Sequence, residues 1–176
     1  MSTFDNCIVR QLKSTDDITG FRCGDKDLDD FIEYQAKDYG AQRLAYNYVM
    51  FGPSKAVAYF SLANDRISID DFDSKTRYNR FRRKYFVNSK RLKGYPAVKL
   101  CRFAVDMQYR GCRVGTSLLN MIKELLANHT RSACRFLIVY ANRDAEEFYI
   151  KNGFLRINDA AEGQTIPMYF DLKMLQ

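Results

Sequence analysis

The pattern of hydrophobic and polar residues in the first part of the chain predicts a strand, a helix and a hairpin. The stretch CIVRQL is typical of a strand. Residues 21–40 carry apolar side chains at helical spacing, and either Asp25 or Asp27 suits the N-cap of that helix. AYNYVMF and AVAYFSLAND are aromatic and β-branched, which predicts two strands joined as a hairpin through Gly52-Pro53. The apolar positions of the predicted helix are Leu28, Phe31, Ile32 and Ala36.

The pattern in the middle of the chain predicts a strand, a helix and a further strand. After Gly94-Tyr95-Pro96, the stretch AVKLCRFAV predicts a strand, and a helix that begins near Thr116 follows it. FLIVYAN is a short, continuous apolar run, which is the pattern of a strand buried on both faces. The apolar stripe of the predicted helix consists of Leu118, Ile122, Leu125 and Leu126.

The C-terminal part predicts one more helix and one more strand. DAEEFYIKNGF predicts a short helix that is capped by Asp144 and ends at Asn152-Gly153. IPMYFDLKM predicts a final strand. The complete order is strand, helix, two strands, a basic segment, strand, helix, strand, helix, strand. This order predicts an α/β fold with a mixed sheet.

The composition fits one globular domain over residues 1–176. Hydrophobic residues make up 47% of the chain, and no run reaches the roughly 20 apolar residues that a membrane helix needs. The start, MSTFDNCIVRQLK, has no apolar signal-peptide core. The five cysteines are scattered and contain no C-x-x-C, which argues against a disulfide framework and a zinc site. We therefore expect a cytoplasmic protein with reduced thiols, no metal and no membrane partner.

The positive charge is concentrated in one segment. The formal net charge is +7, and residues 77–93 carry eight basic residues and no acidic one, so the rest of the chain is nearly neutral. Interleaved aromatic residues make this composition suited to contacting phosphates and stacking on bases. The alternative is an amphipathic helix with aromatic residues packed inward and a solvated basic face; the two interpretations do not exclude each other. The basic residues are Arg77, Arg80, Arg82, Arg83, Lys84, Lys90, Arg91 and Lys93.

The segment YRGCRVGT links a predicted strand to a predicted helix. The first N–H groups of a helix lack intrahelical partners, the helix dipole adds partial positive charge, and glycine lets an anion approach the backbone. The loop is therefore a candidate site for a phosphate or pyrophosphate, although such turns also occur for packing alone. It matches neither the G-x-x-x-x-G-K-[ST] P-loop nor the G-x-G-x-x-G dinucleotide motif.

Several landmarks in one order resemble the GNAT family of N-acetyltransferases. Arg110–Gly115 resembles the family's pyrophosphate loop, (Gln/Arg)-x-x-Gly-x-(Gly/Ala), with Arg113 in place of the central glycine. The core of the resemblance covers about residues 98–154, and the order strand, helix, strand, strand before it also agrees. The other landmarks are Asn142 just after the next strand, and Phe148-Tyr149 followed by Gly153-Phe154.

The resemblance implies the fold and the cofactor. The fold would be a mixed, mostly antiparallel sheet of about six to seven strands flanked by helices, with a V-shaped splay between its central strands. The cofactor would be acetyl-CoA. The strand before the loop would pair with the pantetheine amides, the loop's N–H groups would wrap the pyrophosphate, and an asparagine would lie near the pantetheine arm. The implied residues are Phe103, Ala104, Val105, Arg110, Gly111, Cys112, Arg113, Val114, Gly115, Thr116 and Asn142.

The resemblance also implies that Tyr149 is the general acid. When an amine attacks the thioester, CoA leaves as a thiolate. A phenol with a pKa of about 10 can protonate a thiolate whose thiol has a pKa of about 8.5, at a cost of about 2 kcal/mol. An acceptor α-amine with a pKa near 8 needs no strong base, unlike a lysine near 10.4. Four carboxylates are candidates for a general base, but a role in a surface salt bridge is favoured for each of them. They are Glu146, Glu147, Asp65 and Asp106.

A narrower resemblance is to the acetyltransferase toxins of bacterial toxin–antitoxin pairs. FRCGDKDLDDFI, the basic segment, YPAVKLCRFAVD and the FY-x-x-x-GF ending carry it, whereas the C-terminal part is longer. It implies acetylation of the α-amine of aminoacyl-tRNA, tRNA contact through the basic segment, and an antitoxin partner. The acceptor stays open at this point, as does the choice between monomer and homodimer. The competing class is a non-catalytic nucleic-acid- or protein-binding module on the same fold.

Overall fold

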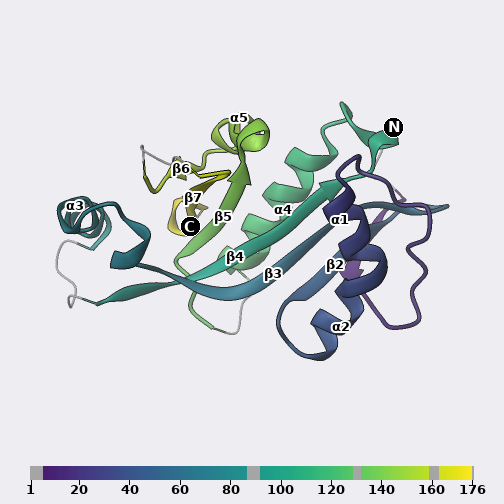
Figure 1. The fold of residues 1–176 in the computed structure, drawn as a ribbon, viewed down its shortest axis with the longest axis horizontal. Helices are drawn as coiled ribbons and strands as arrows, with labels where there is room; N and C mark the ends of the chain where they lie inside the picture. Colours follow the sequence, from purple (N-terminus) through teal and green to yellow (C-terminus); the bar gives the residue numbers. More distant parts are fainter. Residues whose placement is uncertain (1–5, 87–91, 129–131, 159–162, 176) are drawn as a thin grey trace. The chain divides into compact units, whose positions relative to one another are not determined.

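The structure is a computed structural model that describes residues 6–86, 92–128, 132–158 and 163–175 (Figure 1). Within these ranges, seven strands form a sheet in the order β1-β2-β3-β4-β5-β7-β6. The strands are β1 Ile8–Gln11, β2 Tyr46–Phe51, β3 Ala56–Ser68, β4 Gly94–Val105, β5 Phe136–Asn142, β6 Leu155–Arg156 and β7 Thr165–Asp171. The helices are α1 Lys26–Asp30, α2 Ala36–Ala41, α3 Lys75–Tyr85, α4 Val114–Asn128 and α5 Glu146–Lys151. The predicted α/β fold is confirmed.

The chain divides into two compact units. Unit 1 consists of Met1–Ala63 and Leu100–Met121, and unit 2 of Asn64–Lys99 and Ile122–Gln176. Strands β3 and β4 and helix α4 each contribute a part to both units. The single-domain organisation stays a prediction. None of the helices in the described ranges has the length and hydropathy needed to cross a bilayer.

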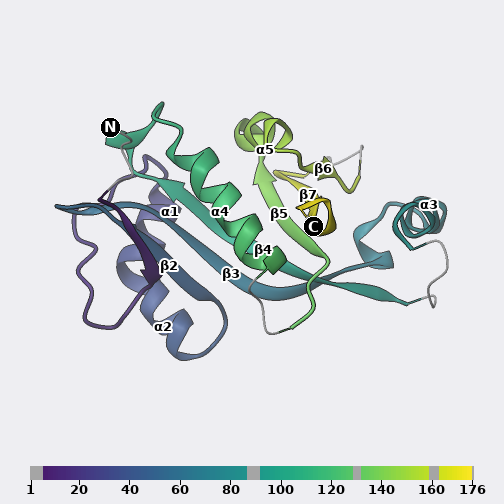
Figure 2. The ribbon, with the colours of Figure 1, turned by 180° about the vertical axis from the view of Figure 1, so that it is seen from behind.

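Unit 1 contains the predicted hairpin. Strands β2 and β3 pair antiparallel, and Tyr48 stacks on its cross-strand partner Phe60 with ring centroids 5.0 Å apart. Asp25 is the N-cap of α1, as predicted, and accepts the N–H groups of Asp27 and Leu28 at 3.0 and 3.2 Å. Helices α1 and α2 lie on one face of the unit 1 strands, and the unit 1 part of α4 lies on the other face (Figures 1 and 2).

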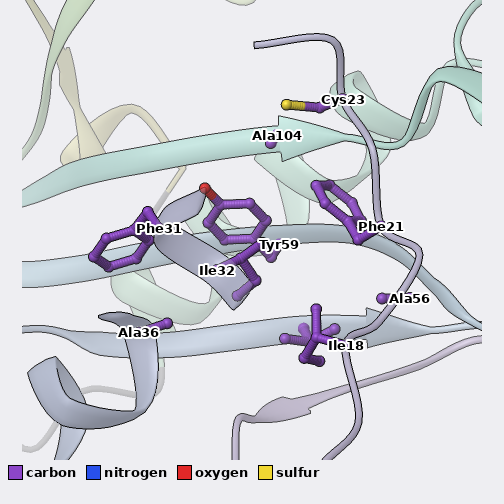
Figure 3. Close-up of a cluster of buried hydrophobic side chains, with 10 residues drawn as sticks. Ile18, Phe21, Cys23, Phe31, Ile32, Ala36, Ala56, Tyr59 and Ala104 are labelled. Carbon is purple, nitrogen blue, oxygen red and sulfur yellow. The ribbon is translucent and has the colours of Figure 1, made fainter. Parts of the chain in front are cut away.

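A buried cluster fills the space between α1, α2 and these strands (Figure 3). Its centre is Tyr59, whose ring lies edge-on to Phe21 at 5.4 Å and whose hydroxyl donates to the Leu28 carbonyl at 2.8 Å. Between α1 and α2 the chain forms a π-helical turn, Phe31–Gln35, where the sequence predicts one continuous helix. Helical residues therefore run without a gap from Lys26 to Ala41, and the π-helical turn keeps Phe31 and Ile32 of the predicted apolar face buried in the cluster.

Unit 2 is built around aromatic residues. Strand β5 pairs antiparallel with β7, and its residues 136–139 are all buried, as the apolar run predicts. Phe81 of α3 packs edge-on against Tyr169 of β7 at 5.3 Å, and the hydroxyls of Tyr85 and Tyr169 lie 2.9 Å apart. Tyr78 and Phe81 are buried, so these aromatic residues of the basic segment belong to the core, as the amphipathic-helix interpretation predicts.

Some local predictions are wrong. Asp144 does not cap α5; the N-cap position is Ala145, the last residue of a short 3₁₀ turn, Arg143–Ala145. The two-residue strand β6 was not predicted, and α4 begins at Val114 rather than near Thr116. On α4, Leu119 is fully buried whereas Leu125 is only partly buried.

Candidate active site

The turn after β4 is anchored by a buried carboxylate, Asp106. It is 1% exposed and accepts hydrogen bonds from Lys55 Nζ at 2.8 Å, the Arg22 N–H at 3.1 Å and the Gln108 N–H at 3.0 Å. Burial alone would raise the pKa of Asp106, but the ammonium and the two N–H donors outweigh it and hold this pKa below its usual range. Asp106 is therefore a structural ion-pair residue, as predicted, although it is buried rather than on the surface.

The side chain of Arg110 also fixes this turn. Its guanidinium donates to the carbonyl of Cys23, and its backbone N–H donates to Met107 at 3.3 Å. The N–H of Arg110 thus has a partner within the turn, and the role of Arg110 at the pyrophosphate stays a prediction. Gly24 beside Cys23 has a φ of +84°, and a Cβ there would lie 3.2 Å from the Met107 sulfur. The positive φ favours glycine at this position, and the N-terminal segment lies against Met107 of the turn.

Two residues of the predicted pyrophosphate loop, Arg110–Gly115, have left-handed backbone. Gly111 has a φ of +77° and Arg113 a φ of +59°, and both are exposed together with Cys112. Arg113 is the residue that replaces the family's central glycine, so this position is one where glycine is conformationally favoured. An L-residue in this conformation costs about 1–2 kcal/mol. The strain expected for a positive φ at this position is present.

Helix α4 begins inside this loop, at Val114, directly after Arg113. The N–H of Ser117 donates to the Arg113 carbonyl at 3.0 Å, which is the first intrahelical bond. The N–H groups of Val114, Gly115 and Thr116 precede it, so helix geometry leaves them without an intrahelical acceptor. Together with the positive end of the helix dipole, they have the geometry that binding a pyrophosphate would need, and the predicted loop lies in unit 1. The predicted cofactor-binding residues Phe103, Ala104 and Val105 end strand β4 in the same unit.

Replacing Arg113 with glycine should raise the free energy of unfolding by about 0.5–1 kcal/mol, because the relieved strain exceeds the extra chain entropy that glycine loses. Denaturant unfolding measures this difference. We expect the affinity for acetyl-CoA to change less than about threefold, since the backbone N–H groups remain. A gain in affinity beyond about tenfold would show that the arginine side chain obstructs the cofactor.

Cys112→Gly is the matched control for this substitution. Cys112 is also exposed, but it is not among the residues with positive φ. Glycine there relieves no strain and should lower the free energy of unfolding by about 0.5–1 kcal/mol. Equal shifts in the two variants would contradict the strain at Arg113.

The candidate general acid, Tyr149, lies on α5 in unit 2. It is 5% exposed, and its ring packs edge-on against Phe148 at 5.2 Å and Phe154 at 5.3 Å. Burial raises the pKa of Tyr149. Its carbonyl accepts the N–H groups of Asn152 at 3.1 Å and Phe154 at 3.0 Å, which closes the end of the helix. Asn142, the predicted pantetheine neighbour, is exposed at the end of β5 opposite Thr165.

The carboxylates considered as bases are engaged elsewhere. Glu146 pairs with Arg156, and Glu147 pairs with Lys151 at 2.7 Å; both hydrogen-bonded partners lower the pKa of the respective carboxylate. A lowered pKa makes each a weaker base. Asp65 is exposed and accepts the N–H of the next residue at 2.8 Å. In the described part of the chain, no group of three or more histidine, cysteine, aspartate or glutamate side chains could hold a metal ion.

The basic segment forms a cationic groove in unit 2. Arg77, Arg80 and Lys84 recur at positions i, i+3 and i+7 of α3, so they share one face. With Arg156 of β6 they line a pocket of about 160 Å³ whose apolar lining is Phe72, Phe81, Ile157 and Tyr169. Asp73 pairs with Arg77 and Glu146 with Arg156, whereas no ion pair of the described residues involves Arg80 or Lys84. We call this the α3 groove.

The other predicted cations are placed differently. Arg82 and Arg83 lie on α3 but do not line the groove, and Lys93 is exposed just before β4. Lys90 and Arg91 lie outside the described residues. Sequence analysis missed Arg156, which is far from α3 along the chain, and no local pattern in the sequence marks it.

Comparisons with known proteins agree with this architecture. The acetyltransferase (GNAT) domain family matches residues 84–171. A tRNA-acetylating toxin of Mycobacterium tuberculosis (strain ATCC 25618 / H37Rv) is 25% identical over 147 residues, covering 82% of each chain. Among similar solved structures, a tyrosine-to-phenylalanine mutant of KacT has a TM-score of 0.79 at 20% identity, and AtaT complexed with acetyl-methionyl-tRNAfMet has 0.77 at 19%; each match covers 97% of both chains.

The family match, on the α/β fold described above, defines an acetyltransferase. The chain belongs to the GNAT acetyltransferase family, and it is an acetyl-CoA-dependent N-acetyltransferase. The family membership decides between the two classes left open by the sequence, in favour of the enzyme and against a non-catalytic binding module.

Proposed function

We propose that this enzyme acetylates the α-amine of aminoacyl-tRNA. The observation that carries the proposal is the α3 groove, where four cations surround an aromatic floor and only two of them have a carboxylate partner in the described ranges. Such a groove suits the phosphates of a nucleic acid. The similarity to a tRNA-acetylating toxin and to AtaT, solved with an acetylated aminoacyl-tRNA, supports the same acceptor.

The surroundings of the candidate bases also favour an α-amine. The carboxylates near α5 have lowered pKa values and Asp106 is locked in an ion pair, so none is suited to deprotonate an ammonium group. An α-amine with a pKa near 8 is neutral to roughly a quarter at pH 7.5, whereas a lysine side chain near 10.4 is neutral to about 0.1%. The enzyme therefore suits an acceptor amine of which about a quarter is already neutral and able to attack.

The proposed reaction proceeds by direct attack in a ternary complex. The neutral amine attacks the thioester carbonyl, the new C–N bond forms, and the C–S bond breaks as CoA leaves. The thiolate takes the phenolic proton of Tyr149. The tyrosinate is then reprotonated by the proton that the acceptor nitrogen loses, so no proton is gained or lost overall beyond the exchange with solvent.

The same proposal includes a partner and a compartment. Two similar structures are AtaT bound to the C-terminus of the antitoxin AtaR and a KacTA–DNA complex, which supports an antitoxin for this chain as well. An enzyme that consumes charged tRNA would need such a partner, because unrestrained acetylation would stop its own cell from using that tRNA. We propose that it acts in the cytoplasm, where acetyl-CoA and charged tRNA are both present.

An acceptor screen with labelled acetyl-CoA tests this function. We expect label on aminoacyl-tRNA and release of labelled acetyl-amino acid when the ester is hydrolysed by mild alkali. Deacylated tRNA and Nα-acetylated aminoacyl-tRNA are the controls, because neither offers a free α-amine. Labelling of peptides or small amines alone would overturn the tRNA acceptor while leaving the acetyltransferase in place. Label on deacylated tRNA would place the acetyl group on the nucleic acid itself.

A further inference from the structure

Helix α4 carries a lysine in its buried stripe. Lys123 is 5% exposed, and burial lowers the pKa of its ammonium group. It lies four residues after the fully buried Leu119, so the two side chains share the buried face of α4. A buried lysine is costly unless its ammonium group is satisfied. Its partners therefore indicate what it does.

The partners of Lys123 all belong to the segment that closes α5 and to the strand behind it. Its Nζ donates to the carbonyl of Asn152 at 2.5 Å. It also lies over the ring of Phe170 at 4.2 Å and over that of Phe154 at 5.4 Å. Among the residues that the structure describes, these cation–π contacts accompany the hydrogen bond to Asn152, and no carboxylate pairs with Lys123. Lys123 is thus a link from α4 to the end of the helix that carries Tyr149.

The link continues from Asn152 to Tyr149 through hydrogen bonds. The Asn152 N–H donates to the Tyr149 carbonyl at 3.1 Å, and its side-chain Nδ2 donates to the Phe148 carbonyl at 2.8 Å. The chain then turns at Gly153, which has a φ of +82°. Gly153 lies close to Phe170, because a Cβ at this position would be 3.2 Å from the Phe170 ring. The six-residue helix α5 is too short to hold itself, so its orientation depends on this turn.

We propose that Lys123 is a positioning residue for Tyr149: by holding the Asn152 carbonyl, it fixes the turn that sets the orientation of α5 and of the phenol. The proposal rests on the proposed role of Tyr149 as general acid. A small displacement of a catalytic group can cost up to about 100-fold in rate. Removing the ammonium group while keeping the side chain's length should therefore lower kcat more than it disturbs the fold.

A double-mutant cycle with Lys123→Met and Tyr149→Phe tests the proposal. Methionine keeps the unbranched stem against Phe154 and Phe170 but cannot donate to Asn152. We expect Lys123→Met to lower kcat about 10- to 100-fold in the wild type, but less than about twofold when Tyr149 is already phenylalanine. The KM for acetyl-CoA and the thermal unfolding midpoint should stay close to those of the wild type. Lys123→Leu provides a second variant if the methionine variant folds poorly.

Leu126→Met is the matched control, because it alters the same buried stripe of α4 without touching the ammonium group. It should leave kcat unchanged in both backgrounds. An equal fold-loss from Lys123→Met with and without the Tyr149 hydroxyl would overturn the positioning role, while Tyr149 would remain the acid. Full kcat in Tyr149→Phe alone would instead overturn the acid, and with it the role of Lys123.

Discussion

Replacing Tyr149 with phenylalanine is expected to lower kcat by about 10²–10³-fold, with the affinity for acetyl-CoA changed less than about threefold. The substitution removes one oxygen atom and keeps the ring between Phe148 and Phe154. The thiolate must then leave without a proton donor, so the loss falls on the chemical step and not on binding. Steady-state kinetics and calorimetric titration with acetyl-CoA measure the two effects separately.

The pH dependence gives this prediction a second test. Burial raises the pKa of Tyr149, and a raised pKa means that the phenol keeps its proton until the pH passes that higher value. The acid form is therefore fully present between about pH 6 and 10, and kcat should show no descending limb in that range. Its ascending limb should follow deprotonation of the acceptor amine near pH 8, in the wild type and the variant alike.

Tyr140→Phe is the control for the loss of a hydroxyl. Tyr140 lies on β5 in the same unit, is 39% exposed, and carries Lys99 over its ring at 4.0 Å. It should retain wild-type kcat. A Tyr149→Phe enzyme with full activity, or a descending limb near pH 8–9 that vanishes in that variant, would contradict the assignment of a buried, protonated acid.

The elements that local sequence pattern determines were predicted correctly. The hairpin through Gly52-Pro53 and the buried residues 136–139 of β5 follow from alternation and from a continuous apolar run. The end of α5 at Gly153 follows from its backbone, since a φ of +82° is one that glycine adopts without penalty. Each of these features depends on neighbours in the sequence, which is why the pattern is sufficient.

Features that depend on distant contacts were missed. The two residues of β6 are too few to show any periodicity, and they are a strand only because Leu155 and Arg156 pair with β7. The left-handed backbone of Arg113 contradicts the preference of its residue type, so the sequence gives no sign of it except the family's glycine at that place. A helical-wheel view of α4 places Lys123 on the buried stripe, but its partner Asn152 is visible only in the fold.

The candidate site divides in the same way. Residue types and their order predicted the cofactor loop and the tyrosine, and the family match supports the class of enzyme. The contacts that shape the loop, from Asp106 to Lys55 and from Arg110 to the Cys23 carbonyl, join segments far apart in the chain. The sequence predicts a basic patch over the whole segment. In the structure, three cations of this segment line the α3 groove, together with Arg156 from β6.

The three α3 cations that line the groove can be tested directly for a role in tRNA binding. Changing Arg77, Arg80 and Lys84 together to glutamine should lower the affinity for aminoacyl-tRNA about 30- to 300-fold at about 0.1 M salt. The negative slope of log K against log salt concentration should become shallower by about 2 to 3, since each lost phosphate contact releases one counterion fewer. Acetyl-CoA binding, which we assign to the loop before α4, should be unchanged.

The matched control neutralises three other cations of the same helix. Lys75, Arg82 and Arg83 lie on α3 but do not line the groove, so their triple glutamine variant carries the same net charge. We expect it to lose less than about fivefold in affinity, because charges away from bound phosphates act only through screened, long-range attraction. Equal losses of tRNA affinity in both variants would show that net charge alone, and not the α3 groove, determines binding. Unchanged tRNA affinity in the groove variant would mean that the acceptor binds elsewhere on the protein.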